Sequence, residues 1–378
     1  MHSWRTLLAL LAVLSLSVAG CASAEEQEAA TDVESPAGSQ TEEAADGEDG
    51  EDEGLSADLL GAGASFPDPV YQEWIGEFTT NVEEGVSIQY EAIGSGGGRE
   101  QFIAQETDFA GSDAYMSDEE IADAEEAHGE GEVLHIPMVF GGVVIAFNIE
   151  GLDSLTLDFA TIADIFSGEI TNINDPAIAE LNPDVELPDQ ELTVTVRADG
   201  SGTTSIFTTY LEDEDEDWAA NVGSGDEVDW PAENLVAGEQ NDGVASAVQQ
   251  QPGAIGYLSL EFAVAAGLPY ASVVNADGTA VDPTTESVGA AVEGLDLPED
   301  LRFDVLGVGG EGYPIAGATW VLAYTAGYDE ADAEALKAYL TWALEEGDGI
   351  ASNLGYAPLS DSTQELSLEK VEQINADG

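Results

Sequence analysis

The chain has 378 residues, of which 43% are hydrophobic, and it carries 78 acidic against 6 basic residues for a formal net charge of -72 at pH 7. This length and apolar content are typical of a globular protein with two lobes of ordinary domain size, which excludes a disordered acidic polymer. Nucleic acid is excluded as a partner because so few cations could not neutralise a phosphate backbone.

The first twenty residues have the features of an export signal. Arg5 precedes an apolar run over 6–18, which is too short to span a membrane and has the length of a signal-peptide core. The run ends in Val-Ala-Gly before Cys21, a pattern that resembles the lipobox of bacterial lipoproteins, where the cysteine is acylated and becomes the mature N-terminus. We predict a lipoprotein signal peptide over 1–20 and lipidation at Cys21. The alternative is an ordinary cleaved signal beside an incidental cysteine.

The segment after Cys21 predicts a tether, and the overall charge predicts adaptation to high salt. Residues 22–54 contain no aromatic and no basic residue, so 21–54 is expected to be a disordered acidic tether. Repulsion among the carboxylates would destabilise a compact fold in dilute buffer, whereas molar salt screens it over a Debye length of about 3 Å. A calcium-binding acidic protein is the other interpretation, but no calcium loop of the D-x-[DN]-x-[DN]-G type with a closing Glu occurs.

From residue 55 onward the sequence pattern is that of an α/β protein. Short runs rich in β-branched residues, at 86–90, 143–147 and 192–196, alternate with helical patterns and glycine-rich turns. The acidic run EDEDED at 212–217 predicts an exposed turn before a tryptophan. Cys21 is the only cysteine, so no disulfide within one chain can stabilise this fold.

Three glycine-rich loops each precede a helical pattern. They are GAGASFP at 61–67, followed by apolar residues spaced along one helix face, GSGGGR at 94–99, and RADGSGTT at 197–204. The first turn of a helix has N–H groups without intrahelical partners, and its dipole favours negative charge. One such loop is more often a plain helix cap than a binding site. Three of them, all rich in hydroxyl groups, indicate an anion held by converging helix N-termini.

Two of the scarce basic residues lie in these loops. Asp199 follows Arg197 at a spacing that puts both side chains on one face of an extended segment, so the carboxylate can hold the guanidinium while it binds an oxyanion. Arg99 closes the second loop. It could reach the ligand or be a solvated residue in the first turn of its helix, and the sequence leaves this open.

At these residues the chain resembles the phosphate-binding protein of the bacterial phosphate ABC transporter. The similar stretches cover nearly all of 60–358, and GAGASFP and RADGSGT are the most specific of them. The resemblance implies a two-lobed α/β periplasmic-binding-protein fold (type II-like) with the ligand cleft between the lobes. It places lobe 1 at 55–138 plus 312–378 and lobe 2 at 139–311.

The resemblance also implies the ligand contacts, one residue at a time along its motifs. They are Ser65, Phe66 (through its backbone), Ser95, Asp113, Arg197, Asp199, Ser201, Gly202 and Thr203. This sequence departs from the family at two positions: Ser65 stands where Thr is usual, and Gly96 replaces a second serine. The hydroxyl survives at position 65, so binding is expected to survive too.

Asp113 predicts the choice of ion. A carboxylate in an anion site repels the ligand unless the anion carries a proton for it to accept; phosphate near neutral pH has such a proton and sulfate has none. A buried acceptor that faces a bare oxyanion costs on the order of 1–3 kcal/mol, so Asp113 would select by rejecting the wrong ion. The alternative is that Asp113 only caps the helix that follows it.

The predicted function is therefore binding of inorganic phosphate outside the membrane and delivery to the membrane permease of a phosphate ABC transporter, by a lipid-anchored monomer with no cofactor and no metal. One alternative is a binder of another tetrahedral oxyanion such as sulfate. A phosphoester hydrolase is a second alternative, but a nucleophilic serine needs a base, and His128, His135, Lys337 and Lys370 lie away from the loops in the sequence. A surface adhesion or scaffold protein is a third.

Overall fold

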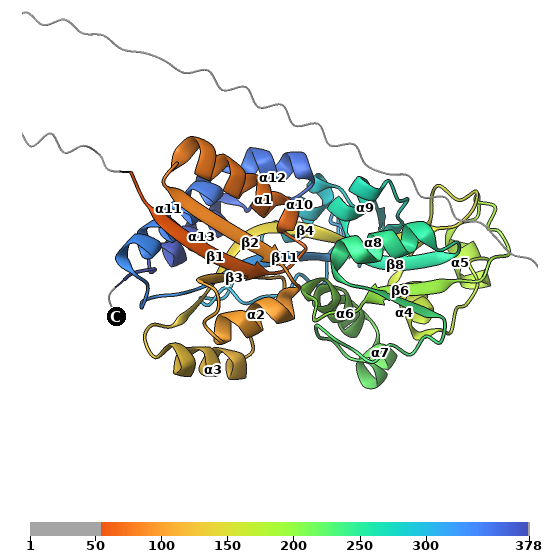
Figure 1. Ribbon diagram of the computed structural model, residues 1–378. Helices are drawn as coiled ribbons and strands as arrows, with labels where there is room; N and C mark the ends of the chain where they lie inside the picture. The colour runs from red at the N-terminus through yellow and green to blue at the C-terminus, as the bar shows by residue number, and fades with distance from the viewer. Residues whose placement is uncertain (1–53, 377–378) are drawn as a thin grey trace, which may run out of the picture. The chain divides into compact units, whose positions relative to one another are not determined.

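The computed structural model describes residues 54–376, so the predicted signal peptide, Cys21 and the predicted tether up to residue 53 lie outside the described residues. Within this range the chain forms an eight-stranded sheet in the order β2-β1-β3-β11-β4-β8-β6-β7 and a small sheet in the order β10-β9-β5 (Figure 1). The strands are β1 (Ala57–Gly63), β2 (Val86–Ala92), β3 (Phe109–Ser112), β4 (Val133–Asn148), β5 (Thr156–Leu157), β6 (Thr193–Arg197), β7 (Leu235–Gly238), β8 (Ala254–Ser259), β9 (Ser272–Val274), β10 (Ala280–Val281) and β11 (Ala316–Tyr324).

The long strand β4 runs through both halves of the main sheet. Its residues up to Gly142 pair with β11, and those from Val143 onward pair with β8. We call β2, β1, β3 and β11 the first half and β8, β6 and β7 the second half; they occupy the left and right of Figure 1. The predicted lobe boundary at 138/139 falls inside β4, four residues before the strand changes partner.

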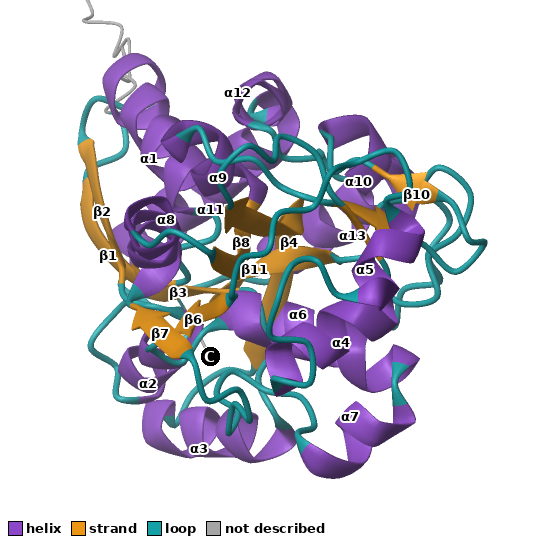
Figure 2. Ribbon diagram, turned by 90° about the vertical axis from the view of Figure 1, so that its right-hand side faces the viewer, coloured by secondary structure: helices purple, strands orange, loops and turns teal. Residues whose placement is uncertain are grey.

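Helices cover both faces of the sheet (Figure 2). In the first half α1 and α2 pack on β1, β2 and β3, while α11 packs on β1; in the second half α8 packs on β6, β7 and β8. The helices are α1 (Asp68–Glu77), the π-helical turn η1 (Phe78–Val82), α2 (Ser95–Ile103), α3 (Asp118–His128), α4 (Phe159–Ser167), α5 (Pro176–Leu181), α6 (Gly202–Glu214), α7 (Glu216–Asn221), α8 (Gln240–Gln250), α9 (Leu260–Ala266), α10 (Thr285–Val292), α11 (Glu330–Glu346), α12 (Asp348–Leu354) and α13 (Asp361–Val371).

The sequence pattern accounts for these elements. The three β-branched runs lie in β2, β4 and β6, and the apolar face predicted after the first loop is buried along α1. The acidic run at 212–217 is not a turn, because α6 continues to Glu214 and Asp215 then caps α7 with its side chain. The Asp215 carboxylate thus accepts hydrogen bonds from backbone N–H groups in the first turn of α7.

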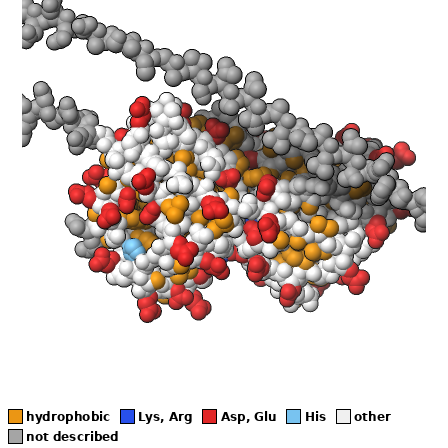
Figure 3. All heavy atoms as spheres, in the orientation of Figure 1, with side chains coloured by type: hydrophobic (Ala, Val, Ile, Leu, Met, Phe, Trp, Pro, Cys, Tyr) orange, Lys and Arg blue, Asp and Glu red, His pale blue; other side chains and the backbone are white. Residues whose placement is uncertain are grey.

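Acidic side chains are spread over both halves of the visible face (Figure 3). Beneath them one large cluster of buried apolar residues extends through both halves, and a smaller cluster lies around α8 and α9. Among residues 54–376, none of the helices combines the length and apolar character needed to cross a bilayer.

Candidate functional site

The second and third glycine-rich loops meet where the two halves adjoin. The amide of Gly96, in the first turn of α2, donates a hydrogen bond of 3.0 Å to the carbonyl of Gly200, just before α6. Gly94 has a positive φ of 89°, and a Cβ there would lie 2.4 Å from Asp199 Oδ2 and 2.7 Å from the Gly200 carbonyl oxygen. A side chain at position 94 would therefore both strain the backbone and force the loops apart.

The N-terminus of α6 lies against two residues of the first half. A Cβ on Gly202 would come within 2.5 Å of Ser95 Oγ and 2.6 Å of Asp113 Cβ. Ser201 is the N-cap of α6: its hydroxyl accepts from the amide of Thr204 at 3.1 Å. The absence of a side chain at Gly202 thus allows the free N–H groups of this helix to approach Ser95 and Asp113 closely.

Arg197 is 6% exposed and is held by residues of the loop after β6 and of α6. Its Nε donates to Asp199 Oδ1 at 2.8 Å, a second nitrogen contacts Asp199 Oδ2, and Nη1 lies 3.3 Å from Thr203 Oγ1. The pairing of Arg197 with Asp199 that the spacing predicts is therefore present. Such a bidentate contact fixes the plane of the guanidinium.

Asp113 follows β3 and is 3% exposed. Its Oδ1 accepts from the Thr319 hydroxyl at 2.9 Å, and its Oδ2 lies 3.4 Å from Ser95 Oγ. Burial raises the pKa of Asp113 to about 7, although the Thr319 hydroxyl and the charge of Arg197 act to lower it. The helix-cap alternative is wrong, because Ser117 is the residue that caps α3.

Thr319 is a site neighbour that the sequence analysis missed. It lies on β11, where the pairing with β4 shifts by one residue: Thr319 is opposite Val139, and Trp320 is opposite Pro137. A bulge of this kind redirects a side chain locally, and a proline inside a central strand is a sequence signal for one. Pro137, within the long apolar stretch at 136–147, could have indicated the irregularity, though not its partner.

Asn241 is a second residue that sequence reasoning missed. It is fully buried in the first turn of α8, and its side chain contacts both Ser65 Oγ and Thr203 Oγ1 at 3.1 Å. Ser65 lies in the first loop and is itself buried, while the next carbonyl, that of Phe66, accepts from Tyr356 Oη at 2.6 Å. The first loop thereby joins the other two through Asn241.

Arg99 is not solvated, so that alternative is wrong. The residue is 8% exposed; its Nε donates to Glu120 Oε1 at 2.8 Å and its Nη1 to Ser112 Oγ at 3.1 Å, and its Nη2 forms an ion pair with Asp226. Glu120 belongs to α3 in the first half, whereas Asp226 lies in the loop that leads to β7 in the second half. Arg99 therefore bridges the two halves, with all three guanidinium nitrogens engaged.

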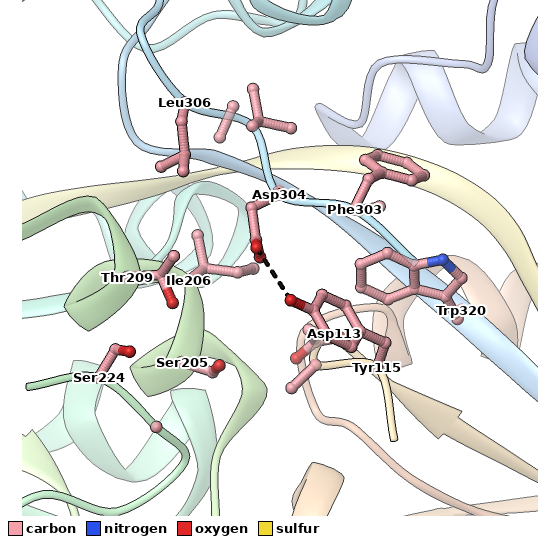
Figure 4. A pocket seen from close by; sticks show the side chains of 16 residues that line it. Asp113, Tyr115, Ser205, Ile206, Thr209, Ser224, Phe303, Asp304, Leu306 and Trp320 are labelled. Atoms are coloured by element: carbon pink, nitrogen blue, oxygen red, sulfur yellow. Dashed lines mark hydrogen bonds between the residues drawn. The ribbon is translucent and has the colours of Figure 1, made fainter. Parts of the chain in front are cut away.

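Two cavities flank this cluster. One of about 170 Å³ lies beside Asp113 between α6, β11 and the segment 303–306, with Tyr115 Oη donating to Asp304 Oδ2 at 3.0 Å in its wall (Figure 4). A second cavity, of about 450 Å³, is lined by Arg197, Asp199 and the 226–230 loop. Of the predicted residues, Asp113 lines the first cavity, and Arg197 and Asp199 line the second.

The two histidines of the described range do not reach the loop serines. His135 is buried in β4, where its Nε2 accepts from the amide of Met116 at 3.0 Å, and burial lowers its pKa to about 3. His128 stacks on Tyr324 at a ring distance of 3.8 Å. Between residues 54 and 376, no group of three His, Cys, Asp or Glu side chains is placed to hold a metal ion.

Comparison with known proteins gives the family. The model of the PBP superfamily domain matches residues 26–346. The chain is 37% identical over 309 residues to the phosphate-binding protein PstS of Xylella fastidiosa (strain Temecula1), covering 80% of this chain and 82% of that protein. It is 34% identical over 335 residues to the phosphate-binding protein PstS of Methanocaldococcus jannaschii, covering 82% of this chain and 85% of the relative.

Solved structures of the same fold agree with this result. A high-affinity periplasmic phosphate-binding protein (PfluDING) bound with phosphate superposes with a TM-score of 0.70 at 22% identity, over 85% of this chain and 99% of that one. A human phosphate-binding apolipoprotein gives a TM-score of 0.67 at 22% identity, over 81% and 92% of the two chains. The predicted two-lobed periplasmic-binding fold is thereby confirmed. The chain belongs to the PBP superfamily and, within it, to the family of the phosphate-binding proteins PstS.

Proposed function

We propose that this protein binds inorganic phosphate at the meeting point of its three glycine-rich loops and delivers it to the permease of an ABC transporter. Two PstS relatives are at least 34% identical to the chain over four fifths of its length, and their names are those of binding proteins rather than enzymes. The loops bring hydroxyl groups, free helix N–H groups and one arginine to a buried place, which are the groups that hold a tetrahedral anion.

The position of Asp113 is the observation that carries the choice of phosphate. The carboxylate is buried beside Ser95 and the N-terminus of α6, and its hydrogen bonds from Thr319 and Ser95 orient it. A carboxylate acceptor surrounded by hydroxyl and N–H donors suits an anion that retains one proton. Phosphate meets this condition near neutral pH and sulfate does not, so a sulfate-binding function is the weaker candidate.

The proposed ligand groups differ in kind. Arg197, oriented by Asp199, contributes the positive charge, and Asp113 accepts a hydrogen bond from the protonated oxygen of the ligand. The remaining groups are hydroxyl or backbone N–H donors that lie in the three loops: Ser65, Phe66, Ser95, Ser201, Gly202 and Thr203. Arg99 is left out because its three nitrogens already have protein partners.

The proposed cellular setting follows from the N-terminal sequence. A lipid on Cys21 would anchor the protein outside the membrane, and the acidic tether would carry a monomeric domain with lobes at 55–138 plus 312–378 and 139–311. Acylation is tested by mass spectrometry of the mature protein and by its loss from membranes in the Cys21→Ala variant.

Calorimetric titration at molar salt tests the function. We expect phosphate to bind with one site per chain and sulfate to give no heat at the same concentration. Equal affinity for both anions would refute the role of Asp113, and no binding of phosphate would refute the function itself. Release of phosphate from an aryl phosphate ester by the purified protein would instead favour the hydrolase alternative.

A further inference from the structure

Asn241 links the first half to the second through the two hydroxyl groups that contact its amide. Its Nδ2 lies 3.1 Å from Ser65 Oγ, in the loop after β1, and 3.1 Å from Thr203 Oγ1, on α6. The residue is wholly buried, so water does not compete for these contacts. Both hydroxyl groups belong to the proposed phosphate site, whereas Asn241 does not.

The orientation of the Asn241 amide follows from a third contact. Its Oδ1 accepts a hydrogen bond of 2.9 Å from the backbone N–H of Ser259. A backbone N–H can only donate, so the carbonyl oxygen must face Ser259 and the NH₂ group must face the hydroxyls. One Nδ2 proton is therefore available for Ser65 and the other for Thr203.

These contacts occupy the acceptor positions of both hydroxyl groups, so that each hydroxyl can only donate. Ser65 Oγ accepts from the Asn241 backbone N–H at 3.2 Å as well as from Nδ2, and Thr203 Oγ1 accepts from Arg197 Nη1 at 3.3 Å as well as from Nδ2. A hydroxyl has two acceptor lone pairs and one proton. When both lone pairs are occupied, the proton is free to point to another acceptor.

We propose that Asn241 is a positioning residue, which turns the protons of Ser65 and Thr203 toward the bound anion. This inference rests on the proposed function and deepens it. Donors that are oriented before the ligand arrives need no reorganisation on binding, which increases affinity. The same arrangement makes the two hydroxyls poor partners for any ligand atom that carries a proton, so that the acceptor role is left to Asp113.

The backbone before Asn241 supports this role. Gln240 has a φ of 59°, in the left-handed region that residues other than glycine seldom adopt, and its N–H donates to Asp199 Oδ1 at 2.9 Å. Strained backbone of this kind persists where the surroundings impose it, and it is concentrated at functional sites. Here it ties the start of α8 to the same carboxylate that orients Arg197.

A comparison of two substitutions separates positioning from simple packing. Asn241→Ala removes the donors, whereas Asn241→Asp keeps the shape but offers acceptors, which would turn both hydroxyl protons away from the anion. We expect Asn241→Ala to weaken phosphate binding by at least about 10-fold and Asn241→Asp by at least about 10-fold more. If Asn241 only fills space and holds hydrogen bonds, the opposite order is expected, and Asn241→Asp weakens phosphate binding less than Asn241→Ala does.

The added charge of Asn241→Asp is controlled by repeating both substitutions in a Ser65→Ala, Thr203→Val background. Charge repulsion persists there, but no hydroxyl remains to be turned, so the gap between the Asp and Ala variants should shrink to about threefold or less. An unchanged gap would overturn the proposal while leaving phosphate binding by the wild-type protein intact. Absence of phosphate binding in the wild type would instead remove the proposed function.

A measurement on the unaltered chain serves if the variants fail to fold. In protein selectively labelled at asparagine, the Asn241 side-chain NH₂ protons should show nuclear Overhauser contacts to the β-protons of Ser65 and Thr203, with and without phosphate. Contacts from those NH₂ protons to the Ser259 amide instead would mean that the side-chain amide is reversed, and the proposal would be wrong.

Discussion

Asp113 is buried, which disfavours its charged form, yet the proposed selectivity needs the charged carboxylate as an acceptor. Its pKa is raised to about 7 mainly by burial, so in the folded protein without ligand the neutral acid persists up to about pH 7. Raised acid pKa values make the folded state bind more protons than the unfolded one, and stability then falls as pH rises from about 4 to about 7. A ligand proton that hydrogen-bonds to the carboxylate would compensate for its burial in the charged form.

The Asp113→Asn variant tests this account of selectivity. Its amide can donate to an anion without protons, so we expect the ratio of phosphate to sulfate affinity to fall by at least about 10-fold, which corresponds to about 1.4 kcal/mol. The unliganded variant should also be more stable than the wild type at about pH 8, because it carries no buried charge. Calorimetry and thermal melting measure the two effects.

Asp304→Asn is the matched control, since Asp304 lines the same cavity but faces Tyr115. It should leave the affinity ratio unchanged. A ratio that stays at the wild-type value in Asp113→Asn would contradict the selector role.

Glu261 is the second buried acid whose ionisation opposes folding. It lies in the first turn of α9, and neither carboxylate oxygen has a hydrogen-bond partner among residues 54–376. Burial raises its pKa to about 8 from the ordinary 4.5, so wild-type stability should fall as pH rises through this interval. We expect Glu261→Gln to melt close to the wild type below about pH 5 and to be roughly 3 to 5 kcal/mol more stable above about pH 8.

Melting curves across the pH range measure the Glu261 effect. The exposed Glu293→Gln serves as the control and should show no such pH dependence. A stability difference for Glu261→Gln that does not change with pH would mean that Glu261 ionises normally in the folded protein.

At the scale of elements, the contact between α2 and the loop before β7 is a cross-cleft ion pair. Arg99 and Asp226 are both mostly buried, with side-chain exposures of 10% and 16%. The backbone of Asp226 also accepts from the amide of Ser201, at the start of α6. Closure of the two halves would therefore form the ion pair and fix the third glycine-rich loop together.

Arg99→Ala should weaken phosphate binding by roughly 2 to 4 kcal/mol, chiefly through faster release, because it leaves a buried carboxylate without its partner. Adding Asp226→Asn should recover part of the loss. Stopped-flow release rates measure both effects.

Arg302→Ala is the comparison, since Arg302 also contacts two carboxylates, those of Asp118 and Asp300, but is more exposed. A loss of affinity as large for Arg302→Ala as for Arg99→Ala would mean that general charge balance, and not the cross-cleft pair, governs release.

The elements that carry the site were predictable because their signals are local. A β-branched run, then glycines and hydroxyl residues, then an apolar stripe describes β2 and α2, or β6 and α6, without reference to the rest of the chain. Arg197 and Asp199 are two residues apart, so their pairing is also local.

The missed residues act through contacts that are distant in the sequence. Asn241 meets Ser65 across 176 positions, and Thr319 meets Asp113 across 206. No periodicity records such a pair, since each depends on how the strands are ordered and, for Thr319, on a bulge in β4 opposite β11. The bridging role of Arg99 was hidden in the same way, by a partner 127 residues away.

At the scale of the whole molecule, the charge should govern both stability and capture. Among residues 54–376, ion pairs hold each arginine and Lys337, so little positive charge is left to balance the acidic surface. Salt shortens the Debye length from about 10 Å at 0.1 M to about 3 Å at 1 M and screens that surface. The short contacts of a buried anion are screened much less.

We therefore expect the melting temperature and the phosphate association rate to rise together between about 0.1 and 3 M NaCl, the reverse of steered encounter between opposite charges. Thermal melts and stopped-flow binding provide the measurements. Sorbitol at matched osmolality should not raise the association rate. An association rate that falls with salt would mean that the mouth of the cleft is locally positive.

The place of β11 in the sheet has a consequence for the order in which the chain can fold. This strand lies between β3 and β4, yet it leaves the ribosome about 170 residues after β4 ends. Until it arrives, β3 and the first part of β4 have open edges with no neighbour between them, and open edges invite aggregation. The second half, with β6, β7 and β8 beside the end of β4, has all its strand partners once β8 is made. The second half can therefore complete its part of the sheet before β11 is synthesised, whereas the first half cannot.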